Sequence, residues 1–226
     1  MKSIEAKPND KDLRAVYADW LEEHDDLLRA EFIRLLLDAS QFEWGSTERP
    51  VIEERLQTLR ARLDDEWLTL VDPHFKVIRV NELLYEMAEA NAGSDHGCGY
   101  SLDVLSKADS LRTALEKHFA QFGTYNPTVQ PPYDWNIQYT KVTRSDAVLR
   151  DTAMHWFYEQ PFSPGDEIAI RNKTVAEFLD RLYAAVGQAQ VFEVEVTPPM
   201  WYDCEWQDFA FENGDQRWFL HLGYSD

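Results

Sequence analysis

Hydrophobic residues recur at the spacing of an α-helix through the first 72 residues of the chain. Asp10 is placed to cap a first helix, and Pro50 suits the first position of a third one. The three runs of hydrophobic residues are Leu13, Val16, Tyr17, Trp20 and Leu21, then Leu28, Phe32, Ile33, Leu36 and Ala39, then Ile52, Leu56, Leu59 and Leu63 leading into Trp67, Leu68 and Val71. Each run falls on one side of a helix. The pattern predicts a three-helix bundle with Tyr17, Trp20 and Phe32 in its core.

The middle of the chain gives a mixed pattern. Residues 75–80 (FKVIRV) alternate like a short strand, and Asn81 is placed to cap a helix that follows. Residues 91–101 (NAGSDHGCGYS) indicate a glycine-rich loop, and helical spacing resumes over 102–122. Three prolines then fall within residues 125–135 (YNPTVQPPYDW), so we expect an extended connection and a domain boundary there.

The C-terminal part of the chain predicts several strands and one helix. The strand-like runs cover residues 137–142, 167–171, 191–196, 205–212 and 217–224. Thr174 and Glu177 form a capping box that opens a helix, and Asn213-Gly214 indicates a hairpin turn. We therefore expect an α+β fold with a mostly antiparallel sheet. Its parts are a helical module of residues 1–72, a mostly helical connecting segment of residues 73–125 and an α+β domain of residues 133–226.

The first helices also resemble a known family. The runs YADWL at 17–21 and RAEFIRL at 29–35, followed by RLDDEWLTL, are similar to the bacterial repeat-companion domain. The similarity covers about residues 10–72. It departs at the turn, where Asp25 and Asp26 replace the glycine-containing connection typical of that family. The resemblance implies a bacterial, helical, non-catalytic module, and it carries over no catalytic residue.

Acidic residues outnumber basic ones by 41 to 22, which gives a net charge of −19. The excess is greatest in residues 190–226, which contain eight acidic residues and one basic residue. The negative electrostatic field of such a chain repels nucleic acid and anionic lipid, so we expect it to bind neither directly. The same field attracts a basic protein partner. Acidity that serves only solubility is the alternative interpretation. Two widely separated cysteines, and no apolar run near the roughly 20 residues of a membrane span, favour a cytoplasmic protein.

Few residues suggest a catalytic or metal-binding role. Asp95, His96 and Cys98 lie together in the glycine-rich loop, where a thiolate could be activated for catalysis. Cys204 and His221 could join His96 and Cys98 as metal ligands, but the spacings of zinc motifs are absent. Phosphate-binding glycine motifs are absent as well, so we expect no cofactor.

The acidic C-terminal stretch also carries aromatic residues and is the candidate partner-binding surface. On a strand over 205–212, Trp206 and Asp208 share one side, while Phe209 and Phe211 share the other, which is the better core face. Aromatic anchors beside steering acids are typical of protein-binding patches. The candidate site residues are Trp201, Asp203, Glu205, Trp206 and Asp208. The alternative is that Trp206 packs beneath the helix that begins near Thr174.

Two classes of function follow from these patterns. The first is a non-catalytic, acidic protein-interaction protein, in the manner of an immunity or inhibitor protein that masks a basic toxin or nucleic-acid-binding partner. The second is an enzyme with a metal-assisted site near His96 and Cys98. The sequence favours the first class, because it contains no motif that specifies a reaction.

Overall fold

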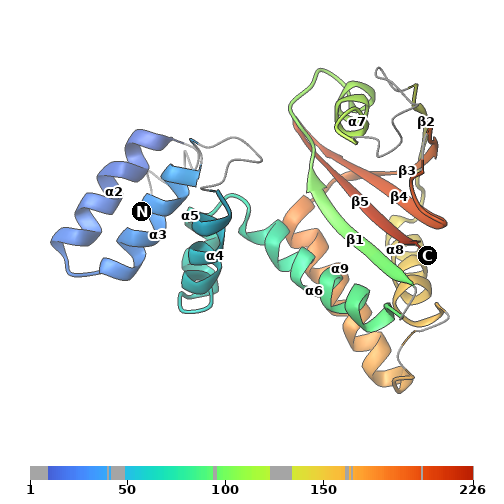
Figure 1. The fold of residues 1–226 in the computed structure, drawn as a ribbon, viewed down its shortest axis with the longest axis horizontal. Coiled ribbons are helices and arrows are strands. Elements are labelled where there is room, and N and C mark those ends of the chain that lie inside the picture. Colours follow the sequence, from blue (N-terminus) through green and yellow to red (C-terminus); the bar gives the residue numbers. More distant parts are fainter. Residues whose placement is uncertain are drawn as a thin grey trace. The chain divides into compact units, whose positions relative to one another are not determined.

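The structure is a computed structural model, which describes residues 10–39, 41, 49–93, 96–122, 134–160, 163, 165–199 and 201–225. Helices come first along the chain, and a five-stranded antiparallel sheet with further helices follows, so the fold class is α+β, as predicted (Figure 1). The chain divides into two compact units, Met1–Phe75 and Lys76–Asp226, which we call the helical unit and the sheet unit. None of the described helices is both long and apolar enough to cross a membrane.

The helical unit contains four helices in its described residues. They are α2 (Lys11–Glu23), α3 (Leu27–Ala39), α4 (Arg49–Arg60) and α5 (Asp65–Val71). The side chain of Asp10 accepts a hydrogen bond from the backbone N–H of Leu13 (3.2 Å), which caps α2 as predicted. Asp64 caps α5 in the same way through the N–H of Trp67 (2.8 Å). This second cap divides the expected third helix into two.

The core of the helical unit is built mainly from small and branched aliphatic side chains. Its members with almost no exposed surface are Ala18, Leu21, Ala30, Phe32, Ile33, Leu56, Leu59, Leu68 and Val71. Phe32 is in this core, as predicted, and the Trp67 ring packs edge-on against it with centroids 5.7 Å apart. Tyr17 is half-buried, and its hydroxyl accepts a hydrogen bond from Nε1 of Trp67 (3.1 Å).

The prediction that Trp20 belongs to this core is wrong. Its side chain is 49% exposed, although Leu21 beside it is buried. Arg34 of α3 donates hydrogen bonds to Asp19 (2.6 Å) and to Glu22 (2.9 Å) of α2. These bonds are consistent with a rotation of α2 that turns Leu21 inward and leaves Trp20 outside.

The sheet unit begins in a helix, whose first residue Phe75 is the last residue of the helical unit, and it ends with three strands. Its elements are α6 (Phe75–Asn91), β1 (Gly97–Val104), α7 (Leu111–Phe119), β2 (Asn136–Lys141), α8 (Ser145–Tyr158), α9 (Ile168–Val186), β3 (Gln190–Thr197), β4 (Glu205–Asn213) and β5 (Gln216–Ser225). The strand order is β1-β5-β4-β3-β2, and every neighbouring pair is antiparallel. The predicted strands at 137–142, 191–196, 205–212 and 217–224 correspond to β2, β3, β4 and β5.

Helices cover both faces of the sheet. Figure 1 shows α7 on one side, and α6, α8 and α9 on the other. The larger core contains Phe209 and Phe211 of β4, so the predicted core face of that strand is confirmed. A second core lies under α7 and contains Ala210, Phe219 and Phe119. Because α7 covers this second face, the side of β4 that carries Asp208 is not the open polar surface that alternation alone suggested.

Two segments that alternate like strands are helical. Residues 75–80 open α6 and residues 168–171 open α9, because helical spacing continues for many residues beyond each short alternation. Asn81 consequently lies inside α6 and does not cap it. Conversely, the expected glycine-rich loop becomes β1 from Gly97 onward, and the expected helix over 102–122 shortens to α7.

The expected division of residues 73–226 also differs from the structure. Strand β1 lies within the predicted connecting segment, yet it pairs along its whole length with β5, from Gly97 opposite Ser225 to Val104 opposite Trp218. The described part of residues 73–125 therefore does not stand apart from the sheet. Most of the proline-rich boundary at 125–135 lies outside the described residues.

Candidate functional site

A histidine held between two carboxylates marks the end of the sheet where β4 begins and β5 ends. Nδ1 of His221 lies 2.7 Å from Oδ1 of Asp208, and Nε2 lies 2.9 Å from Oδ2 of Asp203. The Tyr202 hydroxyl donates to the second oxygen of Asp208 (3.2 Å), and the Ser225 hydroxyl donates to the second oxygen of Asp203. We call these five residues the His221 cluster.

Strand register and one glycine bring the His221 cluster together. Asp208 of β4 lies directly opposite His221 of β5, so their side chains meet on the face that α7 covers. Asp203 precedes β4 and reaches His221 by passing over Gly223. A Cβ atom at Gly223 would lie 2.6 Å from Oδ2 of Asp203 and 2.8 Å from Nε2 of His221. Only glycine therefore lets the Asp203 carboxylate approach the ring.

The His221 cluster favours a protonated histidine. Burial alone would lower the pKa of His221, but the hydrogen bonds to Asp203 and Asp208 outweigh burial and raise the pKa to about 9. Burial raises the pKa of Tyr202, and the neighbouring Asp208 adds to that effect. Because each ring nitrogen of His221 donates to a carboxylate, neither is free to act as a base or a metal ligand in this arrangement. The cluster ties the segment before β4 to the sheet.

Strands β3 and β4 separate at the same end of the sheet. Their pairing stops at Val194 opposite Asp208, although β3 stays beside β2 as far as Thr197 and β4 stays beside β5 as far as Glu205. A hollow with a volume of about 300 Å³ lies where the two strands part, and we call it the fork. It is lined by Glu193, Val194, Glu195, Val196, Trp206, Gln207 and Asp208.

The fork combines carboxylates with an aromatic ring. Glu193 and Glu195 are exposed, and Glu193 accepts a hydrogen bond from Nε2 of Gln207 (3.3 Å). Trp206 is half-buried, and its ring meets that of Tyr202 edge-on with centroids 5.3 Å apart. The fork thus offers negative charge, an indole and strand edges that do not pair with each other across it.

The predicted partner-binding residues occupy different environments. Trp201 is 69% exposed and Glu205 is exposed, as a binding surface requires. Trp206 lines the fork, and it packs with the core under α7 and not beneath α9. Asp208 is only 1% exposed and Asp203 is bound to His221, so these two acids hold the site together and Asp208 cannot meet a partner at the surface.

The structure brings His96 and Cys98 together but not with the other expected metal ligands. Sγ of Cys98 lies 3.8 Å from Nε2 of His96. Cys98 packs against the larger core, whereas His221 lies on the opposite face of the sheet, and Cys204 is an exposed free thiol. Within the described residues, no group of three or more His, Cys, Asp or Glu side chains is arranged to hold a metal ion. Asp95 lies outside those residues.

The thiol of Cys98 is not activated. Burial raises its pKa, and the charge of Asp203 raises it further, while a hydrogen bond with Tyr100 partly opposes these effects. A raised pKa keeps the neutral thiol at physiological pH, and the thiol is a poorer nucleophile than the thiolate.

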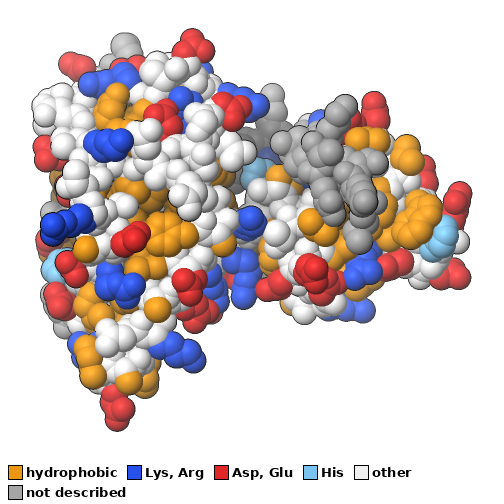
Figure 2. Space-filling model, turned by 180° about the vertical axis from the view of Figure 1, so that it is seen from behind, with side chains coloured by type: hydrophobic (Ala, Val, Ile, Leu, Met, Phe, Trp, Pro, Cys, Tyr) orange, Lys and Arg blue, Asp and Glu red, His pale blue; other side chains and the backbone are white. Residues whose placement is uncertain are grey.

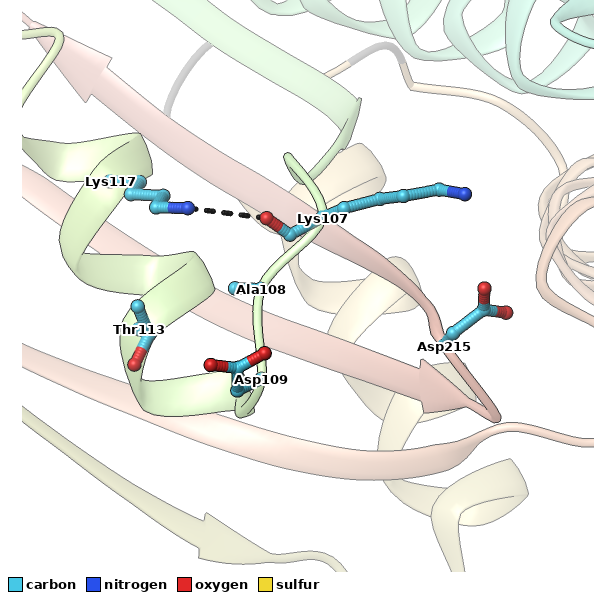
Figure 3. Close-up of a pocket in the computed structure, with 6 residues that line it drawn as sticks. All are labelled: Lys107, Ala108, Asp109, Thr113, Lys117 and Asp215. Atoms are coloured by element: carbon cyan, nitrogen blue, oxygen red, sulfur yellow. Dashed lines mark hydrogen bonds between the residues drawn. The ribbon is translucent and has the colours of Figure 1, made fainter.

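A second hollow lies at the start of α7 (Figure 3). Lys107, Lys117, Asp109 and Asp215 contribute two positive and two negative charges to its lining. Nζ of Lys117 is already engaged with the carbonyl oxygen of Lys107 at 3.2 Å. The balance of charge gives this hollow no clear preference for a ligand.

Comparison of the chain with protein-family models, with curated proteins and with solved structures finds no match.

Proposed function

We propose that this chain is a non-catalytic, acidic protein that binds a basic protein partner through the end of the sheet that carries the fork. The observation that carries the proposal is the fork itself, which is lined by Glu193 and Glu195 on one face of the sheet and by Trp206 on the other. A basic protein surface fits this chemistry, because carboxylates form charge-assisted hydrogen bonds with lysine or arginine side chains and an indole face attracts a cation.

The surroundings of the fork support recognition of a protein and not only of a small cation. Trp201 is 69% exposed and lies four residues before the exposed Glu205, in the segment that the His221 cluster ties down through Asp203. An aromatic anchor on a segment held in place loses little conformational entropy on binding. Surrounding acids would speed encounter with a basic surface.

A protein of this kind would act in the manner of an immunity or inhibitor protein that masks a basic, nucleic-acid-binding partner. The net charge of −19 supports this role, because an acidic surface imitates the charge of nucleic acid. The resemblance of residues 10–72 to the repeat-companion domain supports a non-catalytic role as well. An enzyme acting near His96 and Cys98 has less support, because the pKa of the Cys98 thiol is raised.

The test uses the partner that co-purifies with the full chain from its native host. Glu193→Gln and Glu195→Gln together remove two charges at the fork, and Glu86→Gln with Glu89→Gln removes two exposed charges on α6 as a matched control. Surface-based binding kinetics are measured at low and high salt, since salt at about 0.1 M screens exposed charges beyond roughly 10 Å.

We expect the fork variant to associate more slowly and dissociate faster than the control variant, with the difference in association shrinking at high salt. Equal kinetics for the two double variants at both salt concentrations would mean that the fork does not contact the partner and that its acids serve solubility alone.

A further inference from the structure

An exposed aromatic ridge lies on α2 of the helical unit, far along the chain from the fork. Val16 is 66% exposed and Trp20 is 49% exposed, and they are four residues apart, so they lie one turn apart on the same side of the helix. Figure 2 shows hydrophobic side chains at the surface of this unit, with acidic side chains among them. The unit buries its core with other residues, so the fold does not need these two side chains inside.

The ring of Trp20 is held in place despite its exposure. It stacks on the Tyr17 ring with centroids 5.9 Å apart and planes 12° apart, and on the His24 ring with centroids 4.1 Å apart. The Tyr17 hydroxyl accepts a hydrogen bond from the buried Trp67, which holds the Tyr17 ring in place. Nδ1 of His24 donates to the carbonyl oxygen of Trp20 (2.8 Å). An exposed tryptophan in a fixed orientation is the kind of residue that anchors protein interfaces, because little freedom is lost on binding.

The charges beside the ridge indicate what covers it. The exposed acids of α2 and the turn after it are Asp12, Asp19, Glu22, Glu23 and Asp25. Arg34 offsets Asp19 and Glu22 in part, and Lys11 is the one exposed basic residue of α2 within its described span. A second copy of this chain would bring the same acids against these, and anionic lipid would be repelled in the same way.

We infer that the ridge formed by Val16, Tyr17, Trp20 and His24 docks a basic amphipathic helix of a protein partner. The apolar side of that helix packs on Trp20 and Val16, and its lysines or arginines meet the acids on either side. This surface is independent of the fork, because it lies in the other unit and uses other residues.

The probe is a synthetic amphipathic peptide of leucine and lysine, roughly 18 residues or about five helical turns long. Its fluorescently labelled form is titrated with the full chain and followed by anisotropy. Trp20→Ala is compared with Tyr85→Ala, which removes an aromatic side chain of α6 that is 64% exposed and changes no charge. A peptide with glutamate in place of lysine serves as the charge control.

We expect Trp20→Ala to weaken binding roughly tenfold or more, as for an aromatic hot spot, and Tyr85→Ala to leave it unchanged. Thermal melting of Trp20→Ala should stay close to that of the native chain, since the side chain is half exposed. Binding that is equally tight for both variants, or equally tight for the acidic peptide, would overturn the inference. So would a native chain that forms dimers which Trp20→Ala dissociates, because the occupant would then be a second copy.

Discussion

Gly223→Ala should destabilise the sheet unit by displacing Asp203 from His221. The added Cβ would stand 2.6 Å from Oδ2 of Asp203 and 2.8 Å from Nε2 of His221, which is closer than such atoms approach one another. The Asp203 carboxylate must therefore move, and its 2.9 Å hydrogen bond with His221 is lost. Both side chains are about 85% buried, so the bond is poorly replaced by water.

The size of the effect follows from the kind of bond that is lost. A hydrogen bond to a charged group contributes roughly 1.5–3 kcal/mol to stability. For a unit of about 150 residues, 1 kcal/mol shifts the melting temperature by roughly 2–4 °C. We therefore expect Gly223→Ala to melt on the order of 3–12 °C below the native chain.

Gly99→Ala is the matched control for Gly223→Ala. Gly99 pairs with Gly223 across β1 and β5, but a Cβ atom there meets nothing within 4 Å. Both substitutions make the same change to the entropy of the unfolded chain, so the difference between them isolates the clash. Thermal unfolding followed by circular dichroism measures it. If Gly223→Ala melts at the same temperature as Gly99→Ala, the Asp203–His221 contact does not stabilise the fold.

Three further outcomes test other parts of the structure. The pKa of His221 rises from 6.5 to about 9 on folding, so the protonated ring stabilises the fold fully below pH 6.5. Roughly 3 kcal/mol of the free energy of unfolding is lost as the pH rises to about 9. Urea unfolding of the native chain should show this fall, and urea unfolding of His221→Asn should not. Asp25 has a φ of 59° in the turn after α2, a backbone conformation that glycine adopts more easily than aspartate. Asp25→Gly should therefore raise the stability of the helical unit by about 0.5–1 kcal/mol. An unchanged urea midpoint would argue against that backbone conformation. The Asn81 side chain forms hydrogen bonds with both the N–H and the carbonyl oxygen of Leu102 on the edge strand β1. Asn81→Leu should therefore speed hydrogen exchange of the Leu102 amide at least several-fold. Unchanged exchange would show that the amide is protected by other contacts.

The C-terminal hairpin shows what sequence patterns predict well. Alternation located β4 and β5 within a residue or two, and Asn213-Gly214 located the turn between them. The register was not predictable to the residue. A turn centred on Asn213-Gly214 would pair Asp208 with Phe219, whereas the actual turn is centred one residue later and pairs Asp208 with His221. The His221 cluster depends on this shift of one residue.

The helical unit shows where a hydrophobic pattern is insufficient. The helices were predicted because hydrophobic residues recur at helical spacing over long segments. That pattern assigns every hydrophobic residue on one side of a helix to the core. The orientation of α2 is consistent with its contacts with α3, including the ion pairs of Arg34, and these come from residues distant in the sequence. Helical spacing alone therefore did not predict that Trp20 is exposed. Helix α8 was not predicted, although its buried residues Leu149, Ala153, Trp156 and Phe157 follow helical spacing.

The fork could not be predicted from the sequence either. Alternation identified β3 and β4 separately, but nothing in either strand indicates where their pairing ends. The separation after Val194 and Asp208 reflects the different neighbours of the two strands, since β3 follows β2 while β4 follows β5. A sequence that gives each strand correctly therefore still leaves the hollow between them unknown.

Hydrogen exchange of the full chain with and without its co-purified partner tests the central claim most directly. If a basic partner occupies the fork, those backbone amides of Glu195–Thr197 and Glu205–Gln207 that point into the fork should exchange clearly more slowly in the complex, because β3 and β4 do not pair with each other there. The amides of Glu86 and Glu89 on α6 should exchange at the same rate in both samples. Protection that is confined to other parts of the chain, with the fork amides exchanging as fast in the complex as in the free protein, would contradict the assignment of the fork as the binding site.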